Sequence, residues 1–297
     1  MTTAVYPHLP PDTLKKEEDD STARELSWLL ESLQETLVSL KSGLEECYAL
    51  LAPIEPGSTL VMSSPRSESV KGHVTRVGTR IVKGTLHLRL KTLPHTHISL
   101  TPALPALESL RDLLNQALDC VDITRWTGDR HSAAFISGQL RLLHSILVSS
   151  LSLLSGSPLS SSSSPSPSSP PWTSTSTPHS PSDPSYPPNL SLHLTPSAGS
   201  LILTVRVLEP VTAEPSLGLV TKLAFAIGAQ RRLEHDEMEG VFVVAGEKVR
   251  VREKVVVESS ADPMMLVLGA KLGALERTVE AGRVGLRVVC GEEVDGD

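Results

Sequence analysis

The sequence predicts an α+β protein in which a helical bundle is joined to an antiparallel β-rich part. In four segments, apolar residues recur at every third or fourth position, which is typical of helices. In the other segments they recur at every second position, which is typical of strands. Composition agrees, because aromatic residues are only 3% of the chain. The core must therefore consist mainly of leucine, which favours helices, and valine, which favours strands.

Composition and charge favour a globular protein that does not bind nucleic acid. The 297 residues suffice for one large domain or two ordinary ones, and 39% of them are apolar. The net charge is −7, and basic residues such as those at 250–254 are mixed with Glu247 and Glu253. A nucleic-acid-binding protein would need a basic stripe that this sequence lacks.

The cysteines and the termini predict a cytosolic protein. Cys47, Cys120 and Cys290 are odd in number and widely spaced, which is typical of reduced thiols. The N-terminus is polar and acidic, unlike a signal peptide. No apolar stretch approaches the ~20 residues that span a bilayer, so we expect membrane association only through partners.

The first predicted helix follows a tail at residues 1–20 that we expect to be disordered. A capping box, with Thr22 as N-cap and Glu25 bonding back to it, predicts where the helix begins. Apolar residues then alternate at intervals of four and three, as in the a and d positions of heptads, until Pro53. This seam consists of Leu26, Leu30, Leu33, Leu37, Leu40, Leu44, Cys47 and Leu51.

The seam has two interpretations. It could be a coiled-coil zipper for a partner chain, or one helix of a bundle within the chain, since both use the same geometry. Trp28, Leu29 and Val38 widen the apolar stripe beyond a two-in-seven seam. A wide stripe suits a helix with several neighbours, so we favour the bundle.

Further helices are predicted in the middle and at the end of the chain. The bundle is expected to comprise residues 21–55, 103–154 and 260–285. Two helices lie in the middle segment, the first beginning near Pro105. The last helix is expected to start with Ser260 or Asp262 as N-cap and Pro263 in its first turn.

The β part is expected at residues 56–102 and 190–259. Alternation from Thr85 to Lys91, preceded by a turn at Gly78, indicates a hairpin. A second hairpin turns at residues 197–200, and strands are expected at 241–244 and 249–257. Between the parts, residues 155–189 form a Ser/Pro/Thr tract that we expect to be a disordered linker. Its Ser-Pro pairs are candidate sites for proline-directed kinases.

No motif for catalysis, a cofactor or a metal ion is present, so the sequence favours a non-enzymatic protein. His95 and His97 lack a third ligand, and residues 234–239 are interpreted as a solvated acidic turn. Gly269 and Gly273 are expected to allow close helix packing. An enzyme with a site assembled only in space is the remaining alternative.

Several collinear stretches carry a resemblance to a known family. The first is the helix with Trp28 and its heptads, followed by residues 61–64 and by Val70, Lys71 and Gly72. Further stretches lie at residues 188–207, at 228–234, which contains Gln230, Arg231 and Leu233, and at 249–279. In this order they resemble the Rogdi leucine-zipper family, which includes the second subunit of the fungal RAVE complex. The Ser/Pro tract is an insertion, and residues 282–297 replace an aromatic end.

The resemblance implies an elongated two-domain fold and a role in RAVE, which promotes reassembly of the V-ATPase V1 sector with its membrane sector. The implied partners are the large β-propeller RAVE subunit, the Skp1 adaptor and V1 subunits. It implies a cytoplasmic protein recruited peripherally to vacuolar or early endosomal membranes, and no catalytic residue. The alternative is a dimeric coiled-coil scaffold or regulator unrelated to the V-ATPase.

Overall fold

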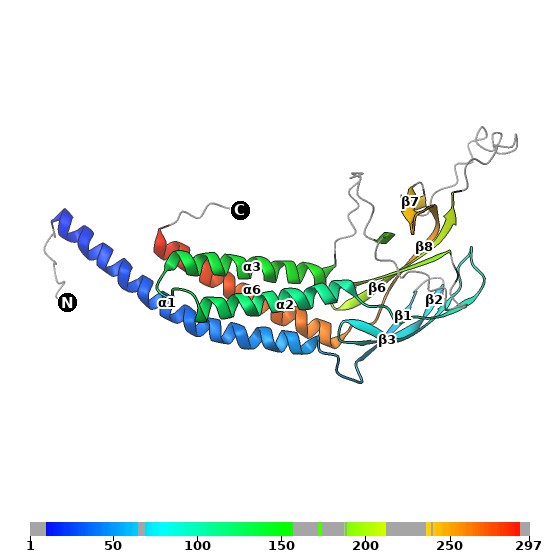
Figure 1. The fold of residues 1–297 in the computed structure, drawn as a ribbon, viewed down its shortest axis with the longest axis horizontal. Coiled ribbons are helices and arrows are strands. Elements are labelled where there is room, and N and C mark those ends of the chain that lie inside the picture. The colour runs from blue at the N-terminus through cyan, green and yellow to red at the C-terminus, as the bar shows by residue number, and fades with distance from the viewer. Residues whose placement is uncertain are drawn as a thin grey trace, which may run out of the picture. The chain divides into compact units, whose positions relative to one another are not determined.

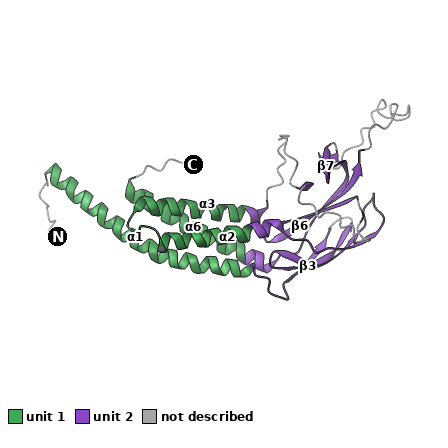
Figure 2. Cartoon of the chain, viewed as in Figure 1, with its two compact units in different colours: residues 1–50, 110–152, 268–297 green, residues 51–109, 153–267 purple. Residues whose placement is uncertain are grey.

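A computed structural model describes residues 10–64, 69–156, 172–173, 187, 189–211, 236–238 and 240–291. The chain divides into two compact units (Figure 2). Unit 1 comprises residues 1–50, 110–152 and 268–297, and unit 2 comprises residues 51–109 and 153–267. The long helices are α1 (Pro11–Leu50), α2 (Pro105–Trp126), α3 (Ala133–Ser155) and α6 (Pro263–Cys290). Together with two antiparallel sheets, they confirm the predicted α+β class.

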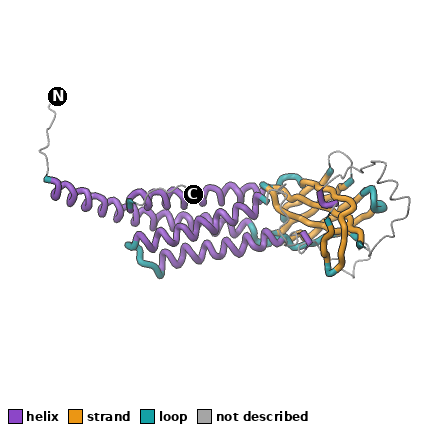
Figure 3. The backbone as a smooth tube through the Cα atoms, turned by 90° about the horizontal axis from the view of Figure 1, so that it is seen from above, coloured by secondary structure: helices purple, strands orange, loops and turns teal. Residues whose placement is uncertain are grey.

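Unit 1 is a bundle in which α1, α2, α3 and α6 run side by side (Figures 1 and 3). Polar contacts join each helix to two neighbours. Lys41 of α1 binds Asp122 of α2 at 2.7 Å, and Lys271 of α6 binds Glu46 of α1. Two further contacts close the ring: Cys120 Sγ of α2 with Gln139 Oε1 of α3 at 3.4 Å, and His144 Nε2 of α3 with Glu276 Oε1 of α6 at 3.1 Å.

The first helix begins earlier than its predicted capping box. It starts at Pro11, so residues 11–20 of the predicted disordered tail are helical. Thr22 is not an N-cap, because its hydroxyl donates to the Glu18 carbonyl inside the helix at 3.0 Å. Pro11 suits the first helical position, and opposite charges four residues apart, as at Lys15 and Asp19, support the added turns. The added turns are exposed and project beyond the other helices of the bundle (Figures 1 and 3).

Unit 2 contains two four-stranded antiparallel sheets. Sheet A has the order β1 (Ser58–Ser63), β2 (Val70–Val77), β3 (Arg80–Leu88) and β4 (Thr96–Ser99). The predicted hairpin at Gly78 is confirmed, since β2 pairs with β3 and Gly78 has a φ of 60°. Its buried face carries the alternating side chains that periodicity indicated, including Val74, Ile81, Leu86 and Leu88.

Sheet B has the order β5 (Leu190–Ser197), β6 (Ser200–Pro210), β8 (Glu247–Glu258) and β7 (Val241–Val244). The predicted hairpin at 197–200 is confirmed, and Ala198 and Gly199 both have positive φ in its turn. A bulge in β8 lies opposite Val207 and Leu208, where the pairing skips Arg252. The bulge changes which side chains of β8 share a face with those of β6.

Gly269 and Gly273 of α6 do not allow close packing as predicted. A Cβ atom on Gly269 would meet nothing within 4 Å, and one on Gly273 would meet only Arg277 Nη1, at 3.6 Å. Close approaches occur elsewhere in the bundle: a Cβ on Gly43 would lie 2.7 Å from Leu275 Cδ2, and one on Gly282 would lie 3.0 Å from Leu33 Cδ2. The small residues therefore allow α1 and α6 to approach at Gly43 and Gly282.

Helix α3 differs from the expectation that no segment is long and apolar enough to span a membrane. By length and composition alone it would pass as a spanning helix. Core helices of soluble proteins meet the same criterion, and 33% of its most apolar window is buried here. Leu140, Leu143 and Leu147 are buried, while Leu142 and Val148 are exposed.

Candidate functional site

The heptad seam lies inside the bundle of its own chain up to Cys47, and its last member, Leu51, follows α1 and belongs to unit 2. All its members but Leu26 are buried, and Leu26 is half-buried. Leu33 faces Gly282 of α6, which in turn lies near Leu140 of α3. The chain therefore covers the seam with its own helices. The buried members are Leu30, Leu33, Leu37, Leu40, Leu44, Cys47 and Leu51.

The opposite side of α1 carries two apolar side chains in an acidic setting. Trp28 is 69% exposed and Val38 is 50% exposed, so the prediction that they widen the buried stripe is wrong. Glu31 and Glu35 are exposed at the intervening positions, and spacings of three and four place all four side chains on one side of the helix. We call these four residues the outer face of α1.

The outer face belongs to the most acidic element of the chain. Helix α1 has ten acidic and four basic residues, which leaves a net −6 of the chain's −7. Among the described residues, neither Glu31 nor Glu35 forms a salt bridge, so their charge is available to a partner. Exposed tryptophan is a frequent energetic centre of protein interfaces. The outer face of α1 is therefore the candidate partner-binding surface of unit 1.

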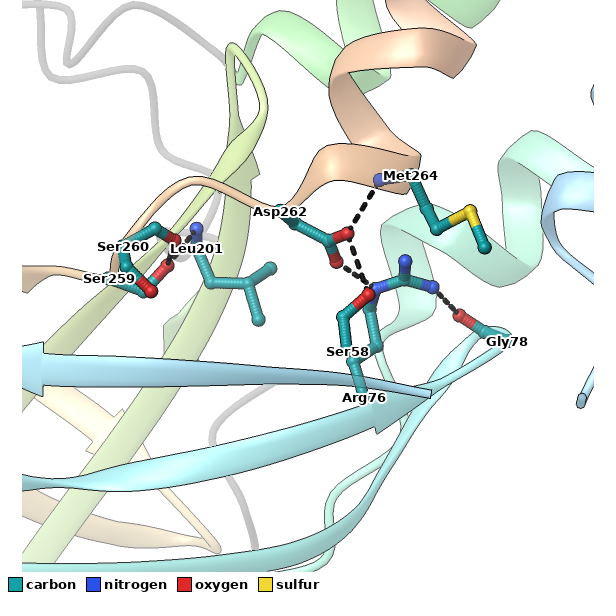
Figure 4. A network of polar contacts seen from close by, with 8 residues as sticks. All are labelled: Ser58, Arg76, Gly78, Leu201, Ser259, Ser260, Asp262 and Met264. Atoms are coloured by element: carbon teal, nitrogen blue, oxygen red, sulfur yellow. Dashed lines mark hydrogen bonds and ion pairs between the residues drawn. The ribbon is translucent and has the colours of Figure 1, made fainter. Parts of the chain in front are cut away.

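In unit 2, residues 259–262 join the two sheets (Figure 4). Ser259 N donates to Leu201 O of β6 at 2.8 Å, and Leu201 N donates to Ser259 Oγ at 2.9 Å. The next residue makes the same reciprocal pair with β1, since Ser260 N donates to Val61 O at 2.8 Å and Val61 N donates to Ser260 Oγ at 3.0 Å. We call residues 259–262 the sheet-joining segment.

The segment ends at Asp262, which caps α6 as predicted. Its Oδ1 accepts from Met264 N and from Ser58 Oγ, both at 3.0 Å, and its Oδ2 accepts from Arg76 Nε at 2.6 Å (Figure 4). Both members of the Asp262–Arg76 ion pair are buried, at 0% and 3% exposure. Burial alone would raise the pKa of Asp262, but the hydrogen bond and charge of Arg76, with the Ser58 and Met264 donors, lower it.

A second polar network lies on sheet B around Glu237, which stands in the short helix η1 (Asp236–Met238). Its carboxylate accepts two bonds from Arg206, at 2.7 and 3.0 Å, and one from Lys254 at 3.0 Å. Burial opposes ionisation, but these cations lower the pKa of Glu237. The interpretation of residues 234–239 as a solvated acidic turn is therefore wrong at Glu237, because its charge is paired.

Trp172 is the functional candidate that sequence reasoning missed. It lies within the tract predicted as a disordered linker, yet it is 4% exposed and packs in a core cluster with Leu208, Val249 and Val251. Most other residues of that tract lie outside the described residues. The available signal was a tryptophan, accompanied only by Tyr186 among aromatic residues, in a segment otherwise rich in serine and proline.

The positions that carry the family resemblance have different environments. Val70 is buried at the start of β2, and Lys71 is exposed. Gly72 is required by geometry, since a Cβ there would lie 2.0 Å from the Thr85 carbonyl oxygen. Gln230, Arg231 and Leu233 lie outside the described residues.

The thiols and the histidines in the described part of the chain show no shared site. Burial raises the pKa of Cys47 to about 11, although Lys271 opposes the shift, and burial also raises the pKa of Cys120. His97 lies in β4 opposite His87, with ring centroids 4.1 Å apart. Within the described ranges, no three His, Cys, Asp or Glu side chains group as metal ligands.

Comparison with known proteins identifies a family. A family model described as "Rogdi leucine zipper containing protein" matches residues 25–287. No curated protein matches the chain. The match begins near the heptads of α1 and includes both sheets and most of α6.

Proposed function

The chain belongs to the Rogdi leucine zipper family, and from this we propose that it is a non-catalytic subunit of a RAVE-type complex. In this role it would promote reassembly of the V-ATPase V1 sector with the membrane sector and so support acidification of vacuoles and endosomes. The observation that carries the proposal is the family match over residues 25–287, which extends through both units.

The proposed mechanism uses binding energy alone. A scaffold holds two partners close together, which raises the effective concentration of one at the other. The partners in this proposal are the large β-propeller RAVE subunit, the Skp1 adaptor and V1 subunits. The protein would be cytoplasmic and would reach the membrane through those partners.

The outer face of α1 supports a scaffold that binds through the exterior of its bundle. Its exposed Trp28 and Val38 offer apolar contact area, and Glu31 and Glu35 favour a partner surface with lysine or arginine. A zipper between two copies is less well supported, because Leu30 to Leu51 of the seam are already buried by the same chain. Such a zipper would require the bundle to open.

The proposal is tested by deleting the gene in the source organism and restoring the full chain. We expect deletion to impair vacuolar acidification and the return of V1 to the membrane after glucose readdition, and the restored chain to correct both. Normal acidification and normal V1 recruitment in the deletion strain would reject the proposed function.

The same strain tests the outer face. Trp28→Ala combined with Glu31→Lys and Glu35→Lys should reduce V1 recruitment while leaving the protein folded, because none of these side chains is buried. Leu142→Ala is a matched control, since Leu142 is likewise an exposed apolar residue on a bundle helix. Equal recruitment by both variants would show that partners bind elsewhere.

A further inference from the structure

Sheet B holds the side chain of Trp172 in a defined site. Its ring lies edge-on to Phe242, with centroids 5.0 Å apart and planes at 66°, and Arg206 Cζ stands 4.4 Å from the ring centre. The buried side chains of Leu208, Val249 and Val251 form one core cluster with Trp172. We call Arg206, Leu208, Phe242, Val249 and Val251 the tryptophan seat.

Three neighbouring strands build the seat. Arg206 and Leu208 are two residues apart on β6 and therefore share a face. Leu208 pairs with Val251 of β8, and Val249 of β8 pairs with Phe242 of β7. Arg206 of β6 pairs with Lys254 of β8. The bulge lies between Val251 and Lys254, and it places both of these side chains on the face of the sheet that carries the seat.

Arg206 is held in place by contacts that do not involve the Trp172 ring. Its Nε and Nη2 donate to the two oxygens of Glu237, and Lys254 holds the same carboxylate. The buried Nη1 has no hydrogen-bond acceptor among the described residues. The electron-rich face of Trp172 is the group placed over this guanidinium, which is the geometry of a cation–π contact.

Trp172, the side chain that fills the seat, comes from a segment with few other apolar side chains. The tract at 155–189 is dominated by serine, proline and threonine, and Trp172 is preceded by Pro170 and Pro171. Proline limits the conformational freedom that docking must remove, and tryptophan supplies a large contact area. An aromatic anchor on a proline-bearing polar segment is typical of a peptide ligand in a groove.

We propose that the tryptophan seat is a docking site for a tryptophan on a proline-rich segment, and that Trp172 occupies it in the same chain. Trp172 thereby pins the tract to sheet B. A partner segment of the same chemistry can enter only when Trp172 leaves. This inference is independent of the V-ATPase role.

Peptide binding to the full-length chain tests the seat. The probe is a fluorescent peptide of residues 166–178, and its control carries alanine in place of the tryptophan. We expect the Trp172→Ala chain to bind the probe at least about tenfold more tightly than the native chain, because its seat is empty. The control peptide should bind neither chain, and adding Phe242→Ala should abolish binding of the probe. Equal affinity of the two chains, or no binding by a folded Trp172→Ala chain, would overturn the proposal.

A second measurement does not depend on emptying the seat. Tryptophan occurs only at positions 28, 126 and 172, so Trp28→Phe with Trp126→Phe leaves Trp172 as the sole reporter. Its emission should be blue-shifted and protected from acrylamide, and the chain should be monomeric by light scattering. Red-shifted, readily quenched emission would reject a filled seat. A dimer that dissociates on Trp172→Ala would show that the seat is filled by a second copy instead.

Discussion

At the scale of single residues, Asp262 connects three parts of unit 2. Its carboxylate caps α6 and binds Ser58 and Arg76 of sheet A, while its backbone N–H donates to Gly199 O in the turn of sheet B at 2.7 Å. A buried carboxylate with these donors is stable only while it is charged, because it accepts but does not donate. The start of α6 therefore depends on its ionisation.

Replacing Asp262 with asparagine should destabilise the protein strongly. The variant keeps a capping oxygen but leaves the charge of buried Arg76 uncompensated, so we expect a loss of about 3–5 kcal/mol in the free energy of unfolding. Asp122→Asn is the matched control, because its pair with Lys41 is partly exposed and should contribute at most about 1 kcal/mol. Urea titration measures both. Equal losses would contradict the importance assigned to the Asp262 network.

The same network predicts how stability depends on pH. The pKa values of Asp262 and Glu237 are lower in the folded state than their ordinary values of 3.8 and 4.5, so the unfolded chain takes up these protons first. The stabilisation is complete above the ordinary values and is lost as pH falls through the folded-state values. Native protein should therefore lose more stability than Asp262→Asn between pH 5 and pH 3, which urea titration at each pH would show. Parallel losses would exclude Asp262 as a source.

The thiols should react selectively. Cys290 is exposed, whereas Cys47 and Cys120 are buried and their pKa values are raised, so little reactive thiolate forms there at neutral pH. We expect a thiol reagent to modify one cysteine rapidly in native protein and all three after unfolding. Cys290→Ser should remove the rapid phase. A rapid phase that persists in this variant would show that unit 1 opens.

At the scale of elements, two glycines have different surroundings. One lies where two strand backbones approach closely, and the other lies on an open helix surface. Gly72 lies where β2 approaches the backbone of β3, and a Cβ would be 2.0 Å from Thr85 O. Gly269 lies in α6 with no atom within 4 Å of that position. The same residue type is therefore required in one element and tolerated in the other.

Alanine at these two positions should have opposite effects. Gly72→Ala must move strand backbone and should cost about 1–3 kcal/mol. Gly269→Ala should stabilise α6 by about 0.5–1 kcal/mol, because alanine restricts the unfolded chain and favours helix. Thermal unfolding of both variants measures the difference. Destabilisation by Gly269→Ala would restore the interpretation of close packing at that glycine.

Periodicity predicted most helices and strands, but not the contacts between them. The hairpin at Gly78 and the cap at Asp262 follow from local sequence, since turn and cap chemistry act over a few residues. Arg76, the partner of Asp262, lies 186 residues away and has no local signal. Trp172 was missed because composition describes the average of a tract, whereas one aromatic side chain can dock alone.

The start of α1 was predicted wrongly for a related reason. The capping box at Thr22 is a valid local signal, but the bundle already nucleates the helix, and extension by charged residues then costs little. Local spacing did indicate that Trp28 faces outward, because Trp28 lies midway between the seam residues Leu26 and Leu30 and so about half a turn from the seam. The apolar character of Trp28 conflicts with this spacing, and it led to the wrong prediction of burial.

At the scale of the whole molecule, the position of the seam separates two classes of function. A scaffold that keeps its leucines inside its own bundle binds partners through exterior surfaces such as the outer face of α1. A zipper protein joins two copies through those leucines. Leu37 is 1% exposed in the single chain, and this burial is the basis for favouring the scaffold.

Urea unfolding of the full-length chain at two protein concentrations a hundredfold apart tests this assignment most directly. Because the seam is buried within one chain, we predict the same midpoint at both concentrations, and a loss of about 2–5 kcal/mol in Leu37→Ala at either. A midpoint that rises with concentration in native protein, and no longer does so in Leu37→Ala, would show that the leucines join two copies and would contradict the account.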